Sequence, residues 1–159
     1  METFYVRNGS DFREATREEI IARAQALISQ RFRTGSKPLS NSDLMEAFLR
    51  LHLGGLDYEI FGLLHLDTRY RLIAAENMFR GTMNSASVEP REVAQSVLSH
   101  RAAAVTLYHN HPSGIAEPSQ ADEFITQKIR QVLDLINVKV LDHLIVGETV
   151  FSFARAGML

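Results

Sequence analysis

Apolar residues recur with the three-to-four-residue spacing of an amphipathic helix in two stretches of the chain. This pattern predicts one helix over residues 16–32 and another over residues 119–136. Two further helices are predicted from their ends: residues 40–53, which begin with N-cap residues and stop before two glycines, and residues 90–100, which begin with proline. The apolar positions expected to face the core are Ile20, Ile21, Ala24, Leu27, Ile28, Val93, Val97, Leu98, Phe124, Ile125, Ile129, Val132, Leu133 and Ile136.

Between these helices lie apolar runs of the length expected for buried strands. The predicted strands cover residues 58–66, 70–79, 104–108, 138–146 and 149–153. Short polar turns join the first two strands and the last two, which predicts two hairpins. Strands and helices alternate without a strict βαβ repeat, so the predicted fold class is α/β: a mixed β-sheet flanked by helices.

The N-terminal region differs in character from the remainder of the chain. Residues 1–15 are polar and mixed, which predicts an arm without regular structure. A Thr-Gly-Ser-Lys-Pro break at residues 34–38 separates the first helix from the second. We therefore expect an N-terminal arm and helix over residues 1–37 and a core domain over residues 38–159.

Composition narrows the class of protein. The chain has 159 residues, of which 45% are hydrophobic and 23% charged, as in ordinary globular domains. No apolar run approaches the about 18–20 residues of a membrane span, and the N-terminus lacks a signal-peptide core, so we expect a cytoplasmic protein without a membrane partner. The formal net charge of −2 predicts that nucleic acid does not bind tightly. An oligomer is compatible with this composition.

Residues 104–122, which read AVTLYHNHPSGIAEPSQAD, carry the candidate chemistry. His109 and His111 follow an apolar strand and, being two residues apart, project to the same side of it. Asp122 lies one turn into the next helix, and the intervening loop can bring it back beside the two imidazoles. Two histidines and one carboxylate form a three-ligand set for catalytic zinc, Zn²⁺, with the fourth position open to water. The chain has no cysteine, so thiolate zinc sites are excluded.

Each of these residues also has an ordinary structural explanation. The histidines could lie at a solvated strand end, and Ser119 with Asp122 matches a capping box at a helix start. The paired histidines upstream favour the metal site, and cap and metal site can coexist. His143 lies in a late strand, where it is expected in the core or supporting a ligand rather than as a fourth ligand. Strand alternation places Asn110 away from the metal, where it is expected to order the loop.

The segments HNHPSG at 109–114 and SQAD at 119–122 resemble the metal motif H-x-H-P-x-G…S-x-x-D of the JAMM (MPN, or JAB-domain) metalloproteases. The particular wording resembles the bacterial RadC-type branch, as do FRGT at 79–82, PREV at 90–93 and DHLIVG at 142–147. The resemblance covers residues 40–159 and implies a JAMM/MPN-like fold of cytidine-deaminase-like architecture. Longer RadC-type proteins carry a helix-hairpin-helix DNA-binding region ahead of this domain. The chain resembles the short, stand-alone form that lacks it.

The resemblance implies roles for five residues: zinc ligation by His109, His111 and Asp122, transition-state stabilisation by Ser119, and general acid–base catalysis by Glu59. Glu59 opens a buried strand, where a charged carboxylate is costly unless it has a function. Proton transfer from an activated water is such a function. The other carboxylates that could take this part are Glu76, Glu89 and Glu92.

The predicted function is a zinc metallopeptidase of JAMM type, which hydrolyses a peptide or isopeptide bond of a peptide or protein substrate through a metal-activated water. Two rivals stay open: a RadC-type DNA repair or recombination accessory or nuclease, and a non-catalytic MPN interaction module. The net charge and the missing helix-hairpin-helix region disfavour the first, and the complete ligand set disfavours the second. Zinc deaminases in their usual form need cysteine ligands, which the chain lacks.

Overall fold

The structure is a computed structural model that describes residues 3–34, 42–81 and 88–159. The elements in these ranges are β1 (Tyr5–Asn8), β2 (Asp11–Glu14), α1 (Arg17–Thr34), α2 (Ser42–Leu53), β3 (Ile60–Leu66), β4 (Leu72–Arg80), α3 (Pro90–Ser99), β5 (Ala104–Asn110), α4 (Gln120–Asp134), β6 (Lys139–Val146) and β7 (Val150–Ser152). The predicted N-cap residues Ser40 and Asn41, residues 35–38 of the predicted break between the first two helices, and Thr82 of the FRGT segment lie outside the described residues.

Five strands form one mixed sheet in the order β4-β3-β5-β6-β7. β5 and β6 are parallel, whereas the other neighbouring pairs of this sheet are antiparallel. Because parallel neighbours need a crossover, the chain passes through α4 between β5 and β6. In the strand order of this sheet β5 is the central strand, and every one of its residues is buried. The predicted mixed sheet and both predicted hairpins are confirmed.

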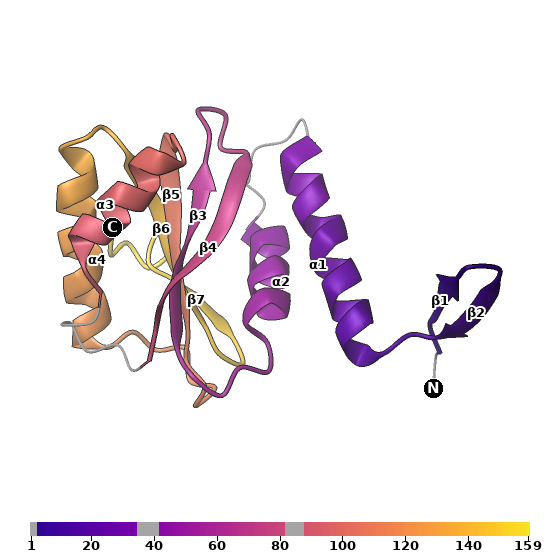
Figure 1. The fold of residues 1–159 in the computed structure, drawn as a ribbon. Coiled ribbons are helices and arrows are strands. Elements are labelled where there is room, and N and C mark those ends of the chain that lie inside the picture. The colour runs from indigo at the N-terminus through magenta and orange to yellow at the C-terminus, as the bar shows by residue number, and fades with distance from the viewer. Residues whose placement is uncertain (1–2, 35–41, 82–87) are drawn as a thin grey trace.

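Helices cover both faces of this sheet (Figure 1). α3 and α4 lie on one face, α2 lies on the other, and α1 lies outside α2. Each face buries its own apolar cluster: Leu49 and Tyr108 belong to the cluster under α2, and Val97 and Leu107 belong to the cluster under α3 and α4. Ile28 of α1 packs against the first cluster. Within the described ranges, no helix has the length and apolar character needed to cross a membrane.

The N-terminal arm is more regular than its sequence predicted. Residues 5–14 form an antiparallel hairpin, β1–β2, which projects beyond α1 on the side away from the sheet (Figure 1). Gly9 and Ser10 form its two-residue turn, and Gly9 has a φ of +66°, a left-handed conformation that glycine adopts without strain. Gly-Ser between two short runs is a hairpin signal. The polar residues on either side obscured this signal in the sequence.

Three apolar residues that were expected to face the core are exposed instead: Leu27, Leu98 and Phe124. In α4 the buried face carries Ile125 and Ile129, which are four residues apart. Phe124 precedes Ile125 by one residue, so it lies about 100° around the helix from that face. The apolar stripes read from the sequence were therefore too wide, because apolar residues next to a buried face can remain at the surface.

Alternation along β5 decides which face of the sheet carries the histidines. Tyr108 packs into the cluster under α2, and Leu107 packs into the cluster under α3 and α4. His109 follows Leu107 by two residues and so shares its face. His111 comes directly after the last residue of β5. Both histidines are thus presented towards α4, the helix that carries the candidate carboxylate.

Candidate metal centre

Three side chains, from the central strand, the loop after it and α4, meet at the end of that strand. His109 belongs to β5, His111 follows it in the loop, and Asp122 lies in the first turn of α4. The backbone of His111 is held by Val146 of β6, whose carbonyl accepts its N–H at 2.9 Å. In the described part of the chain, these three residues form one group whose ligand atoms all lie within 4.8 Å of one another. The structure thus brings together the three residues that the sequence proposed as zinc ligands.

The spacing of their ligand atoms suits a small cation. His109 Nε2 lies 2.9 Å from His111 Nε2 and 3.3 Å from Asp122 Oδ1, and His111 Nε2 lies 3.8 Å from Asp122 Oδ2. Tetrahedral zinc with Zn–N bonds of about 2.0–2.1 Å requires ligands about 3.3 Å apart. The observed separations lie on both sides of that value. His109 and Asp122 are almost fully buried, whereas His111 retains some exposure, so the group is open to solvent on one side.

The ligand atoms of this group are hydrogen-bond acceptors that face one another without a donor between them. The Nδ1 of His111 donates to the carbonyl oxygen of Ile115 at 2.7 Å, so its Nε2 is left as a lone-pair acceptor. Asp122 Oδ1 is buried and has no hydrogen-bond partner. An unpartnered buried carboxylate oxygen is costly, and a cation between it and the imidazole nitrogens removes that cost. The donor set therefore fits a divalent metal such as zinc.

Burial keeps His109 in the form that binds metal. Burial lowers the pKa of His109 to about 4, because the interior disfavours the imidazolium form. The Asp122 carboxylate opposes this shift in pKa, and His111 adds to it. A neutral imidazole retains the lone pair that a metal requires, so His109 is available as a ligand throughout the neutral pH range.

Ser119 caps α4 and holds the carboxylate of Asp122. Its hydroxyl donates to Asp122 Oδ2 at 2.7 Å and accepts the backbone N–H of Asp122 at 3.2 Å. Its own backbone N–H donates to the same Oδ2 at 2.7 Å, which completes a capping box. The predicted capping box is confirmed, and it leaves Asp122 within the candidate ligand group. Because both Ser119 donors engage Oδ2, it is Oδ1 that faces His109 unpartnered.

Glu59 directly precedes β3, and its backbone is held on both sides. Asn110 accepts the N–H of Ile60 through Oδ1 at 2.8 Å and donates through Nδ2 to the carbonyl of Tyr58 at 2.9 Å. The Glu59 carbonyl itself accepts the N–H of Gly81 at 3.0 Å. Asn110 thus orders the segment around Glu59, which agrees with the prediction that it points away from the metal and has a structural part.

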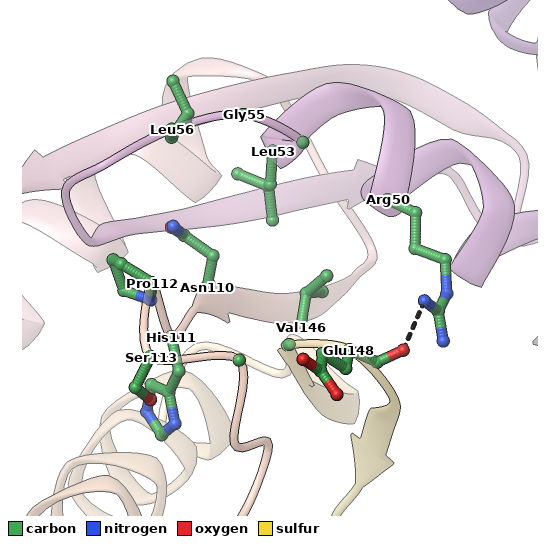
Figure 2. A pocket seen from close by; sticks show the side chains of 13 residues that line it. Arg50, Leu53, Gly55, Leu56, Asn110, His111, Pro112, Ser113, Val146 and Glu148 are labelled. Carbon is green, nitrogen blue, oxygen red and sulfur yellow. Dashed lines mark hydrogen bonds between the residues drawn. The ribbon is translucent and has the colours of Figure 1, made fainter.

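A pocket of about 390 Å³ lies beside His111 (Figure 2). Its walls come from three segments that are distant in the sequence: the end of α2, the loop after β5, and the turn between β6 and β7. Figure 2 shows Arg50 of α2 reaching the carbonyl oxygen of Glu148, to which its guanidinium donates at 2.7 Å. Glu148 in turn donates its backbone N–H to Gly114 at 2.7 Å, which ties the β6–β7 turn to the loop.

The family model described as the RadC-like JAB domain matches residues 39–158. The chain belongs to the RadC-like JAB-domain family. The predicted RadC-type family is therefore confirmed, and the mixed sheet flanked by helices is the JAB-domain fold. The JAB domain is related to the JAMM proteins, which agrees with the resemblance of the HNHPSG and SQAD segments.

Curated relatives share much of the sequence. A UPF0758 protein of Leptothrix cholodnii is 51% identical over 137 residues, which cover 85% of this chain and 60% of that protein. A UPF0758 protein of Pseudoalteromonas translucida is 56% identical over 113 residues, or 70% of this chain and 50% of that protein. A UPF0758 protein of Vibrio cholerae is 45% identical over 141 residues, which cover 89% of each chain. The chain thus spans 60% of the length of the Leptothrix cholodnii protein and 89% of the length of the Vibrio cholerae protein.

A second group of ligand-type side chains lies elsewhere in the JAB domain, and it differs from the first. His65 Nε2 lies 3.0 Å from Glu76 Oε2, the Ser96 hydroxyl donates to the same oxygen, and His100 Nδ1 lies 3.0 Å from the carbonyl oxygen of Ser96. A donor faces each of these acceptor oxygens, whereas His65 Nδ1, which does not face Glu76, is buried without a hydrogen-bond partner. The rings of His65 and His100 also stack at 4.1 Å between centroids. The contacts around Glu76 Oε2 are thus explained without a metal.

This second group predicts a loss of stability in acid. Burial lowers the pKa of His65 below 6.5, although its hydrogen bond to Glu76 opposes the shift. A lowered folded-state pKa means that the unfolded chain binds more protons, so the His65 contribution is present above pH 6.5 and is lost as the pH falls below it. His65→Gln keeps a donor for Glu76 but cannot titrate. With chelator present, we expect its free energy of unfolding to fall less than that of the wild type between pH 7.5 and 5.5.

Denaturant unfolding at the two pH values measures this difference. Buried His109 and His143 also have lowered pKa values, so the variant should retain part of the wild-type dependence. An identical loss of stability in His65→Gln and in the wild type would contradict the assignment to His65.

Two contributors to the site were not found from the sequence. Thr126 lies one helical turn after Asp122 in α4 and reaches both that residue and His143. The four-residue spacing from Asp122 is a signal that could have identified it. Arg50 reaches the pocket from α2, far away in the sequence. Its place depends on how α2 packs on the sheet, for which the local sequence carries no signal.

Proposed function

We propose that the chain is a zinc-dependent hydrolase that cleaves a peptide or isopeptide bond. The observation that carries the proposal is the buried convergence of His109, His111 and Asp122, in which Asp122 Oδ1 has no donor. Membership of the RadC-like JAB-domain family, related to JAMM proteins, supports it. The pocket beside His111 supplies room for a substrate segment next to the ligand group.

In a site of three protein ligands, zinc acidifies a water molecule and polarises a carbonyl group. The chain must then supply a proton acceptor, and we assign this part to Glu59. Phe61 of β3 pairs with His109 of β5, and their rings lie 6.4 Å apart between centroids. Alternate residues of an extended segment share a face, so a continuation of β3 by one residue would put Glu59, two residues before Phe61, on the side of the histidines.

In this proposal Glu59 accepts the proton of the attacking water and delivers it to the leaving amine. The Ser119 hydroxyl, which donates to Asp122 Oδ2, lies beside the ligand group and stabilises the developing oxyanion by turning its donor to the substrate. Asn110 positions Glu59, because its two hydrogen bonds hold the backbone on either side of that residue. A peptide or protein is therefore the proposed partner, and zinc the proposed cofactor.

Metal analysis combined with a cleavage screen tests the proposal. Protein purified without added metal is expected to contain about one zinc per chain, and it should cleave members of a peptide library. A chelator should abolish cleavage, because the activated water is lost, and added zinc should restore it. Zinc-loaded protein that cleaves no peptide or isopeptide substrate, but binds duplex DNA tightly at physiological salt, would favour the DNA-repair accessory instead.

A further inference from the structure

A buried chain of hydrogen bonds leads away from His109. His143 of β6 is fully buried, and its Nε2 lies 2.8 Å from His109 Nδ1, the ring nitrogen that faces away from the ligand group. On its other side, His143 Nδ1 lies 2.6 Å from the hydroxyl oxygen of Thr126 in α4. The Thr126 hydroxyl in turn lies 2.5 Å from the backbone carbonyl oxygen of Asp122. This series of hydrogen bonds therefore begins at one candidate ligand, His109, and ends at another, Asp122.

The hydrogen bond at Asp122 determines which atom is the donor in each of the other hydrogen bonds of this series. A hydroxyl and a carbonyl oxygen 2.5 Å apart require a hydrogen between them, and only the hydroxyl has one to give. Thr126 is then an acceptor towards His143, so His143 carries its hydrogen on Nδ1. The Nε2 of neutral His143 is left as an acceptor, so His109 must donate from Nδ1.

This order leaves the lone pair of His109 on Nε2, the atom that lies 2.9 Å from His111 Nε2 and 3.3 Å from Asp122 Oδ1. The reverse order would place a hydrogen on that atom and block it as a ligand. We infer that Thr126 and His143 are positioning residues, which hold His109 in the one tautomer that can bind the metal. The inference rests on the metal-binding part of the proposed function and names the residues that prepare the site.

The arrangement also explains why these two polar side chains lie in the interior. Thr126 and His143 are both fully buried, and neither contributes a ligand to the group in the described part of the chain. Their hydrogen bonds connect α4, β6 and β5, the three elements around the site. Such outer partners of ligating histidines fix the tautomer and the ring orientation, and their loss weakens metal binding.

Thr126→Val tests the inference, because valine has nearly the shape of threonine but lacks the hydroxyl. We expect its zinc affinity, measured by competition with a chromophoric chelator, to fall roughly 10–100-fold. Thr126→Ser restores the hydroxyl and should bind zinc like the wild type. Thr106→Val is the matched control, since Thr106 of β5 is equally buried but its hydroxyl has no partner. This control should leave the zinc affinity unchanged.

A second measurement on metal-free protein reads the tautomer itself. Long-range ¹H–¹⁵N correlation spectra of the histidine rings should show His109 protonated on Nδ1 in the wild type and in Thr126→Ser. In Thr126→Val they should show a mixture of the two tautomers. Wild-type His109 protonated on Nε2, or Thr126→Val with wild-type tautomer and zinc affinity, would overturn the inference. Because this measurement needs no zinc, it tests the hydrogen bonds from Thr126 through His143 to His109 separately from the proposed metal site.

Discussion

Glu59→Gln is expected to lower the rate of peptide hydrolysis by roughly 10²–10⁴-fold, the usual contribution of a positioned acid–base group, while zinc remains bound. Glutamine keeps the size and the hydrogen-bonding capacity of the side chain but cannot accept a proton from water. The ligand group is untouched, because Glu59 is not a member of it. Turnover of a peptide found with the wild-type protein, together with the zinc content of each variant, measures the effect.

Two carboxylates serve as comparisons for this experiment. Glu92 lies exposed in the first turn of α3, and Glu76 is engaged by His65 and Ser96 in the second group. Glu92→Gln is expected to leave the rate unchanged. Undiminished turnover in Glu59→Gln would place the general base elsewhere, with Glu76 and Glu92 as the next candidates. Loss of zinc in Glu59→Gln would show that Glu59 supports the metal instead of moving protons.

Asp122→Asn is expected to abolish stoichiometric zinc binding and hydrolysis together. The carboxylate supplies the negative charge of the group, and its unpartnered Oδ1 faces His109 at 3.3 Å. An asparagine there is neutral, and if its Oδ1 keeps the Ser119 cap, then its Nδ2, which has no lone pair to offer a metal, takes the position that faces His109. Zinc content by elemental analysis and turnover of the same peptide should therefore fall in parallel.

The matched control is Asp134→Asn, at the exposed end of the same helix. It removes the same charge from α4 far from the ligand group, so zinc content and turnover should equal those of the wild type. His109→Ala is expected to lose zinc as Asp122→Asn does, because it removes a different ligand of the same site. Full zinc occupancy in either ligand variant would refute the assignment of the metal centre.

The candidate ligands were predictable because local chemistry determines them. His109 lies in β5 and His111 directly follows that strand, so alternation along the extended segment predicted that the two share a face. Ser119 and Asp122 are similarly placed by the start of α4, where the capping box defines both side chains. Only the loop between them was undetermined locally, and the Pro-Ser-Gly turn limits how far apart its ends can lie.

Burial was less predictable than secondary structure. The helices and sheet strands were largely placed by apolar periodicity, because a helix or strand must bury one face. That periodicity marks a face only approximately, which is why Leu98 and Phe124 proved to be exposed. The β1–β2 hairpin was missed for the opposite reason: its strands are almost entirely exposed, so no apolar pattern marks them.

By itself, the sequence predicted the candidate three-ligand set and determined the mixed α/β class, because the first rests on motif spacing within residues 109–122 and the second on the order of elements. Tertiary structure alone decided what surrounds the ligands. Pairing of β3 with β5 brings Phe61, two residues after Glu59, against His109, and the crossover through α4 brings Thr126 against His143. Such contacts join residues that lie far apart in the chain, and only the packing of sheet and helices determines which of them meet.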